Sequence, residues 1–332
     1  MMSGFSLAIA MSGIAFLLSI IWGEPFIKLL ALLNIGKLIR DDQPITHRSK
    51  ENTPTMGGFM FLVPITLLTV ILNAVSLFGS RLLGSSILVP LLSLWGYAII
   101  GAIDDWEGIR GTRKGLGMRA RTKFILQVIV ALILAYLMKE VLRVPHLFWP
   151  TAHAPLNFGW AYIPIAAIII VGMTNAMNFT DGIDGLASII SMTAFGIVGI
   201  IALMQNQVFL GRFCFCVVGS LAGFLWFNVN PARLFMGDTG SQALGGTLAV
   251  VALMTGQWLF LPLIAIIPLA ELLSVVIQVS YFKVTKGKRV FKRTPIHHHF
   301  EEIGWTESQI VMRFWIIELV AAMLGLSLTF IR

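Results

Sequence analysis

Three short segments of the sequence carry aspartates whose type and spacing suit metal-assisted chemistry. Asp104 and Asp105 are adjacent, and Asp238 lies within GDTGS. Asp181 and Asp184 lie three residues apart within NFTDGIDGLA. If the three segments converge, five carboxylates cannot share one site without protonation or a bound cation. Oxygen ligands without thiolates suit Mg²⁺ or Mn²⁺, so the pattern predicts a divalent-metal site in which Asp238 is a candidate ligand.

Basic and imidazole side chains that could contact phosphate accompany these acids. Lys50 and Lys123 are candidates, and so is the run His297 to His299, which follows six Lys and Arg residues in 283–293. Together with the acids they indicate phosphoryl transfer, in which catalysis is mostly positioning and charge neutralisation. Each segment also has a plainer interpretation, as a solvated helix end for Asp104 and Asp105 and as a solvated polar loop for the histidines.

A three-residue spacing also runs through the segment that holds Asp181 and Asp184. Residues three apart are neighbours on one face of a helix, so the spacing predicts a polar ladder of Asn175, Asn178, Asp181 and Asp184. Gly182 and Gly185 would let another backbone or a ligand approach closely. Ionisable groups near membrane depth are costly and usually functional, which favours a binding role over an ordinary turn.

The elements that must position these residues are apolar helices. The 332 residues are 57% hydrophobic and 12% charged, whereas a soluble domain carries about 25% charged residues. Long apolar runs without strand alternation predict an all-α polytopic membrane protein in a single domain, residues 1–332. Ten spans are expected, at 3–22, 57–77, 86–103, 122–140, 160–177, 186–204, 208–228, 243–256, 258–282 and 309–331.

Two spans invite closer attention. The first apolar run has no Lys or Arg before it, so we expect a retained helix rather than a signal peptide. Pro262 and Pro268 predict a kink or break in the ninth span. Cys214 and Cys216 point to different faces of one helix, which indicates neither a disulfide nor a metal site.

The distribution of charge predicts the orientation of the chain. The loops on one side carry 17 Lys and Arg residues against 5 on the other, which is the positive-inside pattern. Both termini are therefore expected on the outer side. Thirteen of the sixteen acids fall in or beside the cytoplasmic loops; Glu140, Glu271 and Glu318 are the exceptions. The net charge of +8 reflects this topology rather than nucleic-acid binding, and chemistry is expected at the cytoplasmic face.

Five motifs together resemble one family of enzymes. They are TPTMGG at 53–58, DD at 104–105, NFTDGIDGL at 178–186, GDTGS at 237–241 and HHHFE at 297–301. Their order and the ten-helix layout are similar to the phospho-N-acetylmuramoyl-pentapeptide transferases over essentially the whole chain. NFTDGIDGL and GDTGS are similar to the wider polyprenyl-phosphate N-acetylhexosamine-1-phosphate transferases, whereas TPTMGG and HHHFE are typical of the muramoyl-pentapeptide branch.

The resemblance implies a reaction and its partners. UDP-MurNAc-pentapeptide and undecaprenyl phosphate would give lipid I and UMP, with Mg²⁺, at the inner face of the bacterial plasma membrane during peptidoglycan synthesis. The family is commonly homodimeric, so a homodimer is expected. The lipid phosphate is ionised near neutral pH, which favours its direct attack on the donor over a covalent aspartyl intermediate.

The resemblance also implies roles for individual residues. The expected catalytic residues are Asp104, Asp105, Asp238 and His298, with Asp238 as the Mg²⁺ ligand. The expected substrate-binding residues are Lys50, Lys123, Asn178, Asp181, Asp184, Asn228, Phe235, His297 and His299. One departure is Gly108, because the family often has a lysine three residues after the second aspartate of the DD pair; Arg110 or Lys114 is a candidate replacement for that charge.

Two other functions fit parts of the sequence. A related transferase that uses UDP-GlcNAc would share the GDTGS and NFTDGIDGL motifs, but HHHFE argues against it. A proton-coupled transporter would also carry acids and kinked helices. A carrier needs polar groups near the midplane with access from both sides, whereas the acid cluster here is one-sided.

Overall fold

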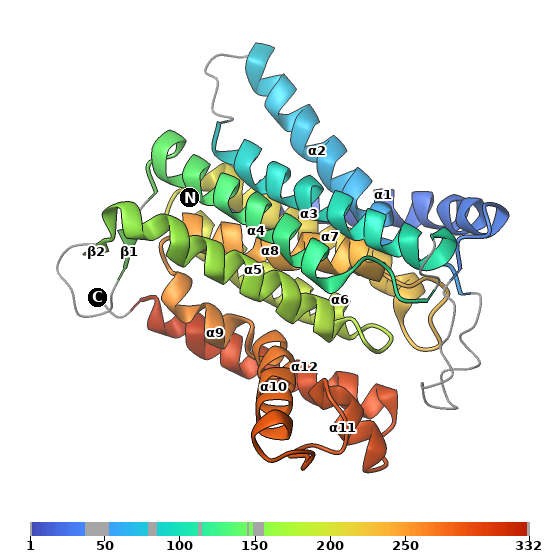
Figure 1. The fold of residues 1–332 in the computed structure, drawn as a ribbon. Coiled ribbons are helices and arrows are strands. Elements are labelled where there is room, and N and C mark those ends of the chain that lie inside the picture. The colour runs from blue at the N-terminus through green and yellow to red at the C-terminus, as the bar shows by residue number, and fades with distance from the viewer. Residues whose placement is uncertain are drawn as a thin grey trace.

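The computed structural model describes residues 2–36, 53–78, 85–111, 115–144, 146–148 and 156–330. Lys50 and Lys114 lie outside the described residues. The chain forms a bundle of helices (Figure 1). The long helices are α1 (Met2–Leu32), α2 (Gly58–Phe78), α3 (Ser85–Arg110), α4 (Ala120–Tyr136), α5 (Tyr162–Thr180), α6 (Leu186–Met204), α7 (Val208–Asn228), α8 (Gly237–Met254), α10 (Ile266–Val284) and α12 (Glu307–Leu328).

Short elements join the long helices. A π-helical turn continues α4 (Leu137–Val141), and β1 (His146–Leu147) pairs antiparallel with β2 (Leu156–Asn157). Two 3₁₀ turns, Gly159–Ala161 and Trp258–Phe260, precede α5 and α9 (Leu261–Ile264). The helix α11 (Ile296–Glu302) carries the three histidines.

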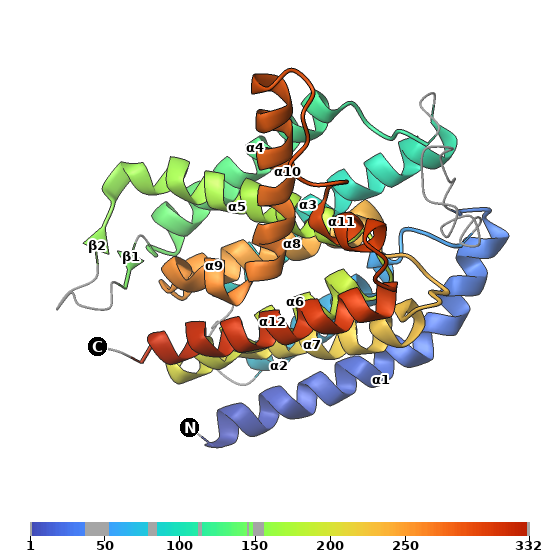
Figure 2. The same cartoon turned by 90° about the horizontal axis from the view of Figure 1, so that it is seen from below.

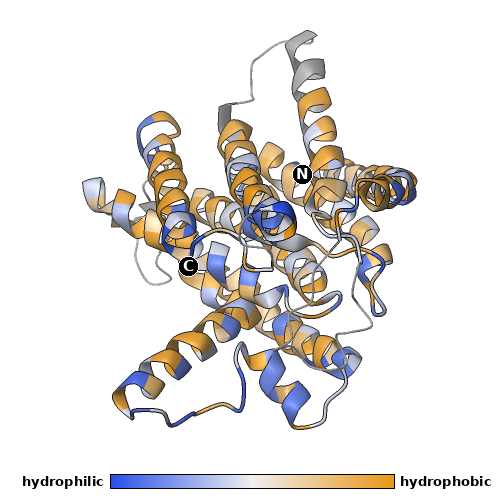
Figure 3. Cartoon of the chain, turned by 45° about the vertical axis from the view of Figure 1, so that its right-hand side comes forward, coloured by the Kyte–Doolittle hydropathy of each residue, from blue (hydrophilic) through white to orange (hydrophobic). Residues whose placement is uncertain are grey.

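The all-α polytopic membrane fold predicted from the sequence is confirmed. Within the described ranges, eight helices are long and apolar enough to cross a membrane. The bundle exposes large apolar side chains, such as Ile21 and Ile168, in the manner expected of a lipid-facing surface. Figure 3 shows apolar residues along most helices, with hydrophilic residues in shorter stretches. The count of ten spans and the outer position of both termini remain predictions.

Helix α8 forms the centre of the bundle and begins six residues earlier than the predicted span. Every residue from Thr239 to Met254 is buried. Its glycines permit this, because a Cβ on Gly246 would lie 2.3 Å from the Tyr97 ring of α3 and one on Gly245 would lie 2.4 Å from the Met173 carbonyl of α5. Small residues let helix backbones approach closely inside a membrane, so α8 is held tightly between α3 and α5.

The predicted break in the ninth span is confirmed and lies at Ala265, between α9 and α10. Pro268 lacks an N–H and its ring clashes with the carbonyl four residues earlier, which is that of Ile264, the last residue of α9. Glu318 of α12 accepts a hydrogen bond from the Ile267 N–H at 3.0 Å and so caps α10. After the break α10 turns away from the direction of its neighbours (Figure 2).

Candidate active site

Two aspartates, from α3 and α8, contact the same lysine side chain of α4. The Lys123 Nζ lies 3.1 Å from Asp104 Oδ2 and also donates a hydrogen bond to Asp238 Oδ2. Asp104 Oδ1 accepts the Met118 N–H at 2.6 Å, which fixes its other oxygen toward the lysine. Asp104 and Asp238 are 134 residues apart in the chain, so the structure brings together two of the predicted catalytic acids.

Asp105 lies beside this pair but makes different contacts. Its Oδ1 accepts the Asp238 N–H at 3.0 Å, and its Oδ2 accepts the N–H and hydroxyl of Thr239 at 3.0 and 2.6 Å. A carboxylate at the first turn of a helix satisfies free N–H groups and complements the helix dipole. Asp105 therefore caps α8 and fixes the position of Asp238; its predicted catalytic role stays a prediction.

Polar side chains of α5 and α8 hold Asp238 from the other side. The Asn178 amide donates to Asp238 Oδ1 and to Ser241 Oγ, both at 2.9 Å. The Gln242 amide donates to Asp238 Oδ2 at 3.2 Å. Sequence reasoning included Asn178 but missed Gln242, although Gln242 lies one helical turn after Asp238 and so shares its face. We call Asp104, Asp105, Lys123, Asn178 and Asp238 the acid centre.

The geometry of the acid centre fits a divalent cation. Within the described ranges no group of three or more His, Cys, Asp and Glu side chains could hold a metal ion by itself. Two carboxylates, Asp104 and Asp238, nevertheless share one positive partner, and their side chains are 14% and 25% exposed. Mg²⁺ commonly uses one or two carboxylates and fills its other positions with water and substrate phosphates, so this donor set suits it.

The polar ladder predicted across α5 and the following turn is wrong beyond Asn178. The helix ends at Thr180, so Asp181 and Asp184 lie in a turn and do not continue the helical face. Gly182 and Gly185 follow this end closely, and Gly185 adopts a positive φ of 82° that favours glycine. Asn175 instead donates to the Gln127 side chain at 2.9 Å.

Asp184 and Asn228 join this turn to the segment that precedes α8. Asp184 Oδ2 accepts hydrogen bonds from the Asn230 amide at 3.0 Å and the Ala232 N–H at 3.1 Å. Asn228 Oδ1 accepts the Gly185 N–H at 3.1 Å, and its amide donates to the Leu234 carbonyl at 2.9 Å. Both side chains are buried, so they shape the backbone around the acid centre.

The TPTMGG segment supports the same region through its backbone. The N–H groups of Gly57 and Gly58 donate to the carbonyls of Phe235 and Met236, both at 2.9 Å. A Cβ on Gly58 would lie 2.5 Å from the Gly240 nitrogen. The two glycines therefore serve close packing between α2 and α8, and their N–H groups are already bonded and do not point to a ligand.

The three consecutive histidines have three different environments. His297 is buried, with Nδ1 3.1 Å from Glu271 Oε2 of α10. His298 Nδ1 lies 2.5 Å from Glu301 Oε2. Burial lowers the pKa of His298, Glu301 opposes this shift and nearby His297 adds to it. His299 Nδ1 accepts the Lys292 N–H at 3.2 Å. Successive helical residues point about 100° apart, which explains the three different environments.

His297 also connects α11 to the turn of Asp181 and Asp184. A Cβ on Gly182 would lie 2.2 Å from His297 Nε2, so glycine allows the imidazole to pack directly on this turn. Glu271, one of the three acids outside the cytoplasmic loops, contacts the imidazole and is buried. Its Oε1 and the His297 Nε2 have no hydrogen-bond partner in the described part of the chain. The turn, α10 and α11 thus meet at one buried polar contact.

Of the two candidate replacements for a lysine at Gly108, Arg110 lies in the described residues and Lys114 does not. The Arg110 guanidinium lies over the Trp106 ring at 5.2 Å and donates to the Leu33 carbonyl at 2.5 Å. The cation that contacts Asp104 is Lys123 of α4.

Comparison with known proteins agrees with this helical site. The model of glycosyl transferase family 4 matches residues 87–256, a range that includes the whole acid centre. A phospho-N-acetylmuramoyl-pentapeptide transferase of Chloroflexus aurantiacus is 42% identical over 98% of this chain and 90% of its own length. Enzymes of the same name from Bacillus mycoides and Bacillus anthracis are 41% and 40% identical, over 95% of each chain.

These matches identify the class of protein and then the family to which the chain belongs. The fold and the family model define a multi-pass membrane transferase. At this identity over nearly its whole length, the chain belongs to the phospho-N-acetylmuramoyl-pentapeptide transferase family.

Proposed function

We propose that this protein transfers phospho-MurNAc-pentapeptide from UDP-MurNAc-pentapeptide to undecaprenyl phosphate, giving lipid I and UMP in peptidoglycan synthesis. Family membership supports the reaction. The observation that carries the site is the convergence of Asp104 and Asp238, from two separate helices, on Lys123. The positive-inside pattern supports a bacterial plasma membrane protein whose site faces the cytoplasm, and a homodimer is part of the proposal.

Asp238 and Asp104 are the residues that would hold Mg²⁺. The bound ion would supply charge neutralisation for the phosphates of donor and acceptor. Lys123 contacts both carboxylates and would bind a phosphate oxygen when a metal takes its place between them. Asn178 and Gln242 keep Asp238 in one orientation, which limits the reorganisation needed during the reaction.

The contacts of the two adjacent aspartates favour direct displacement. In this step an oxygen of the lipid phosphate bonds to the β-phosphorus of the donor, and the bond from that phosphorus to the UMP oxygen breaks. A covalent route needs an aspartate oxygen as nucleophile. Asp105 uses both oxygens to cap α8, and Asp104 uses both for Met118 and Lys123. Asp104, nearer to the lysine, is the better candidate for orienting the incoming phosphate.

We further propose that the segments around the turn of Asp181 bind the uridine diphosphate. Asp184 and Asn228 would act indirectly, by fixing the backbone of this region. Asp181, Phe235 and Lys50 would contact the uridine diphosphate directly. His297 borders the same turn through Gly182. His298 and His299 follow it on α11, and His298 would bind a donor phosphate.

Release of UMP from purified protein tests the proposal. Protein in lipid vesicles is supplied with undecaprenyl phosphate and either UDP-MurNAc-pentapeptide or UDP-GlcNAc, with and without Mg²⁺. We expect UMP only with the muramoyl donor and Mg²⁺. Turnover of UDP-GlcNAc alone would reassign the substrate, and UMP exchange into the donor without lipid would favour the covalent route.

A further inference from the structure

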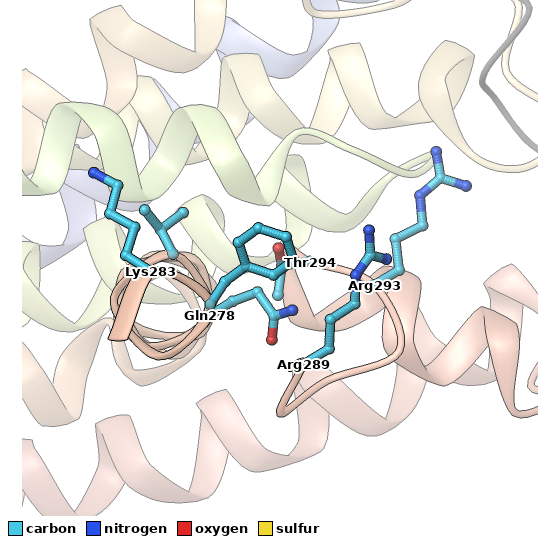
Figure 4. A pocket seen from close by; sticks show the side chains of 7 residues that line it. Gln278, Lys283, Arg289, Arg293 and Thr294 are labelled. Carbon is cyan, nitrogen blue, oxygen red and sulfur yellow. The ribbon is translucent and has the colours of Figure 1, made fainter. Parts of the chain in front are cut away.

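A basic cavity lies beside α11, outside the acid centre. It has a volume of about 410 Å³ and lies between the end of α10 and the loop that leads to α11. Lys283 lines it from α10, and Arg289 and Arg293 line it from the loop (Figure 4). No Asp or Glu is among its lining residues in the described part of the chain. We call this site the basic cavity.

Hydrogen bonds brace the walls of the basic cavity. Gln278 Oε1 accepts the N–H groups of Val290 and Phe291, both at 3.0 Å, which ties the loop to α10. The Arg289 guanidinium donates to the Lys292 carbonyl at 3.3 Å. The cavity therefore lies between two elements that are hydrogen-bonded to each other, with Lys283 on one and Arg289 and Arg293 on the other.

The loop also connects the basic cavity to the histidines. The Lys292 N–H donates to His299 Nδ1 at 3.2 Å, and the Phe291 ring packs edge-on against His299, with centroids 5.8 Å apart. Thr294 lines the cavity and is separated from the first residue of α11 only by Pro295. A ligand in the cavity would thus lie next to the helix that borders the proposed donor site.

The charges of the cavity define the class of ligand. Three cations without a lining acid attract anions, and arginine forms paired hydrogen bonds with carboxylate or phosphate. A phospholipid such as phosphatidylglycerol offers one phosphate charge. A peptide offers a terminal carboxylate and those of any acidic residues, spread along a chain, which matches cations on two separate walls. Arg293 also lies 3.9 Å from Glu302, a distance typical of a weak pair.

We infer that the basic cavity binds the carboxylates of the donor's peptide through Lys283, Arg289 and Arg293. This inference rests on the proposed function, because it assumes a muramoyl-peptide donor. It makes the cavity a specificity site, distant from the transferred phosphate, that distinguishes a charged peptide from an uncharged one. Removal of such a contact weakens binding of substrate and transition state alike, so KM rises and kcat stays unchanged.

The test compares two donors and three proteins. The donors are UDP-MurNAc-pentapeptide and the same molecule with its peptide carboxylates amidated, which keeps length but removes charge. The proteins are wild type, the Lys283→Ala/Arg289→Ala double variant and Lys288→Ala, a control on the same exposed loop that does not line the cavity. For the double variant we expect KM for the charged donor to rise about 10-fold or more with kcat unchanged. The amidated donor should show no such rise, and Lys288→Ala should match wild type.

The outcomes separate this inference from the proposed function. If wild type releases no UMP from either donor, the proposed function fails. If wild type is active but the double variant raises KM equally for both donors, or for neither, the peptide site is refuted. A KM increase for undecaprenyl phosphate alone, or a new dependence on the anionic lipid content of the vesicles, would assign the cavity to lipid instead. Arg289→Lys should restore part of the binding lost in Arg289→Ala.

Discussion

The acid centre and the α11 region, which comprises α11, Glu271 and the turn of Asp181 and Asp184, both place polar side chains near a membrane. They differ in how completely those side chains are hydrogen-bonded. In the acid centre the carboxylates of Asp104, Asp105 and Asp238 have hydrogen-bonded partners on both oxygens. Around α11 the buried pair of Glu271 and His297 leaves polar atoms without partners. Fully bonded groups fix one geometry, whereas unpartnered buried groups are costly. The acid centre is therefore built to hold one geometry, which fits the proposed binding of the reacting phosphates, and the α11 region is less fully bonded.

The largest effect is expected from loss of charge in the acid centre. Asp238→Asn keeps the size of the side chain but removes the charge shared with Lys123 and the proposed metal. We expect kcat to fall about 1000-fold or more, in line with loss of a key electrostatic group, while the melting temperature stays close to wild type. UMP release and thermal unfolding measure the two quantities. Activity near wild type would remove Asp238 from the metal site.

A second change breaks the close packing beneath the acid centre. In Gly101→Ala the new Cβ would lie 2.1 Å from the Asp238 carbonyl oxygen, so α3 and α8 must separate. We expect a loss of about 1–3 kcal/mol in unfolding free energy and a clear loss of turnover. Gly172→Ala on α5 is the matched control, because no atom lies within 4 Å of its new Cβ. Similar stability of the two variants would contradict the packing described for α8.

A third change tests the buried contact under α11. Glu271→Ala removes the carboxylate that lies 3.1 Å from the buried His297 Nδ1, which should cost about 1–3 kcal/mol of stability. Glu271→Gln keeps the shape and should cost less. Thermal unfolding ranks the variants, and donor KM reports any displacement of α11. If alanine and glutamine behave alike and like wild type, Glu271 does not support His297.

The smallest effect concerns pH and His298. Burial lowers the pKa of His298 below its unfolded value, which is about 6.5. The unfolded state therefore binds the proton first as the pH falls, so the folded state loses stability below about pH 6.5. His298→Gln removes this pH-dependent contribution to stability. Its melting temperature should therefore fall less than that of wild type between pH 7.5 and 5.5. If the melting temperatures of the two proteins change in parallel with pH, the lowered pKa of His298 is contradicted.

Much of the fold follows from hydropathy alone. The predicted spans 186–204 and 208–228 coincide with α6 and α7, because Gly185 and the Asn206–Gln207 turn punctuate two uninterrupted apolar runs. Proline chemistry likewise predicted the break before α10. The one-sided distribution of acids indicated where to look for the site.

The details of the site depend on partners far apart in the sequence. Asp105 caps α8 from 133 residues away, and nothing in the local sequence around either residue shows that contact. Lys123 lies at the start of an apolar helix, so its two carboxylate partners emerge only from the packing of α3, α4 and α8. The predicted polar ladder was wrong beyond Asn178 because a three-residue spacing shows which residues would share a helical face. It does not show where the helix ends.

Binding of Mn²⁺ as a probe for Mg²⁺, followed by electron paramagnetic resonance, tests most directly whether Asp104 and Asp238 share one ion. The proteins are wild type, Asp104→Asn, Asp238→Asn and the double variant, in vesicles without substrate. A shared ion predicts that each single variant weakens Mn²⁺ binding. It also predicts that the loss of binding free energy in the double variant is smaller than the sum of the two single losses. Fully additive losses, or binding unchanged in either single variant, would contradict a site built by both aspartates.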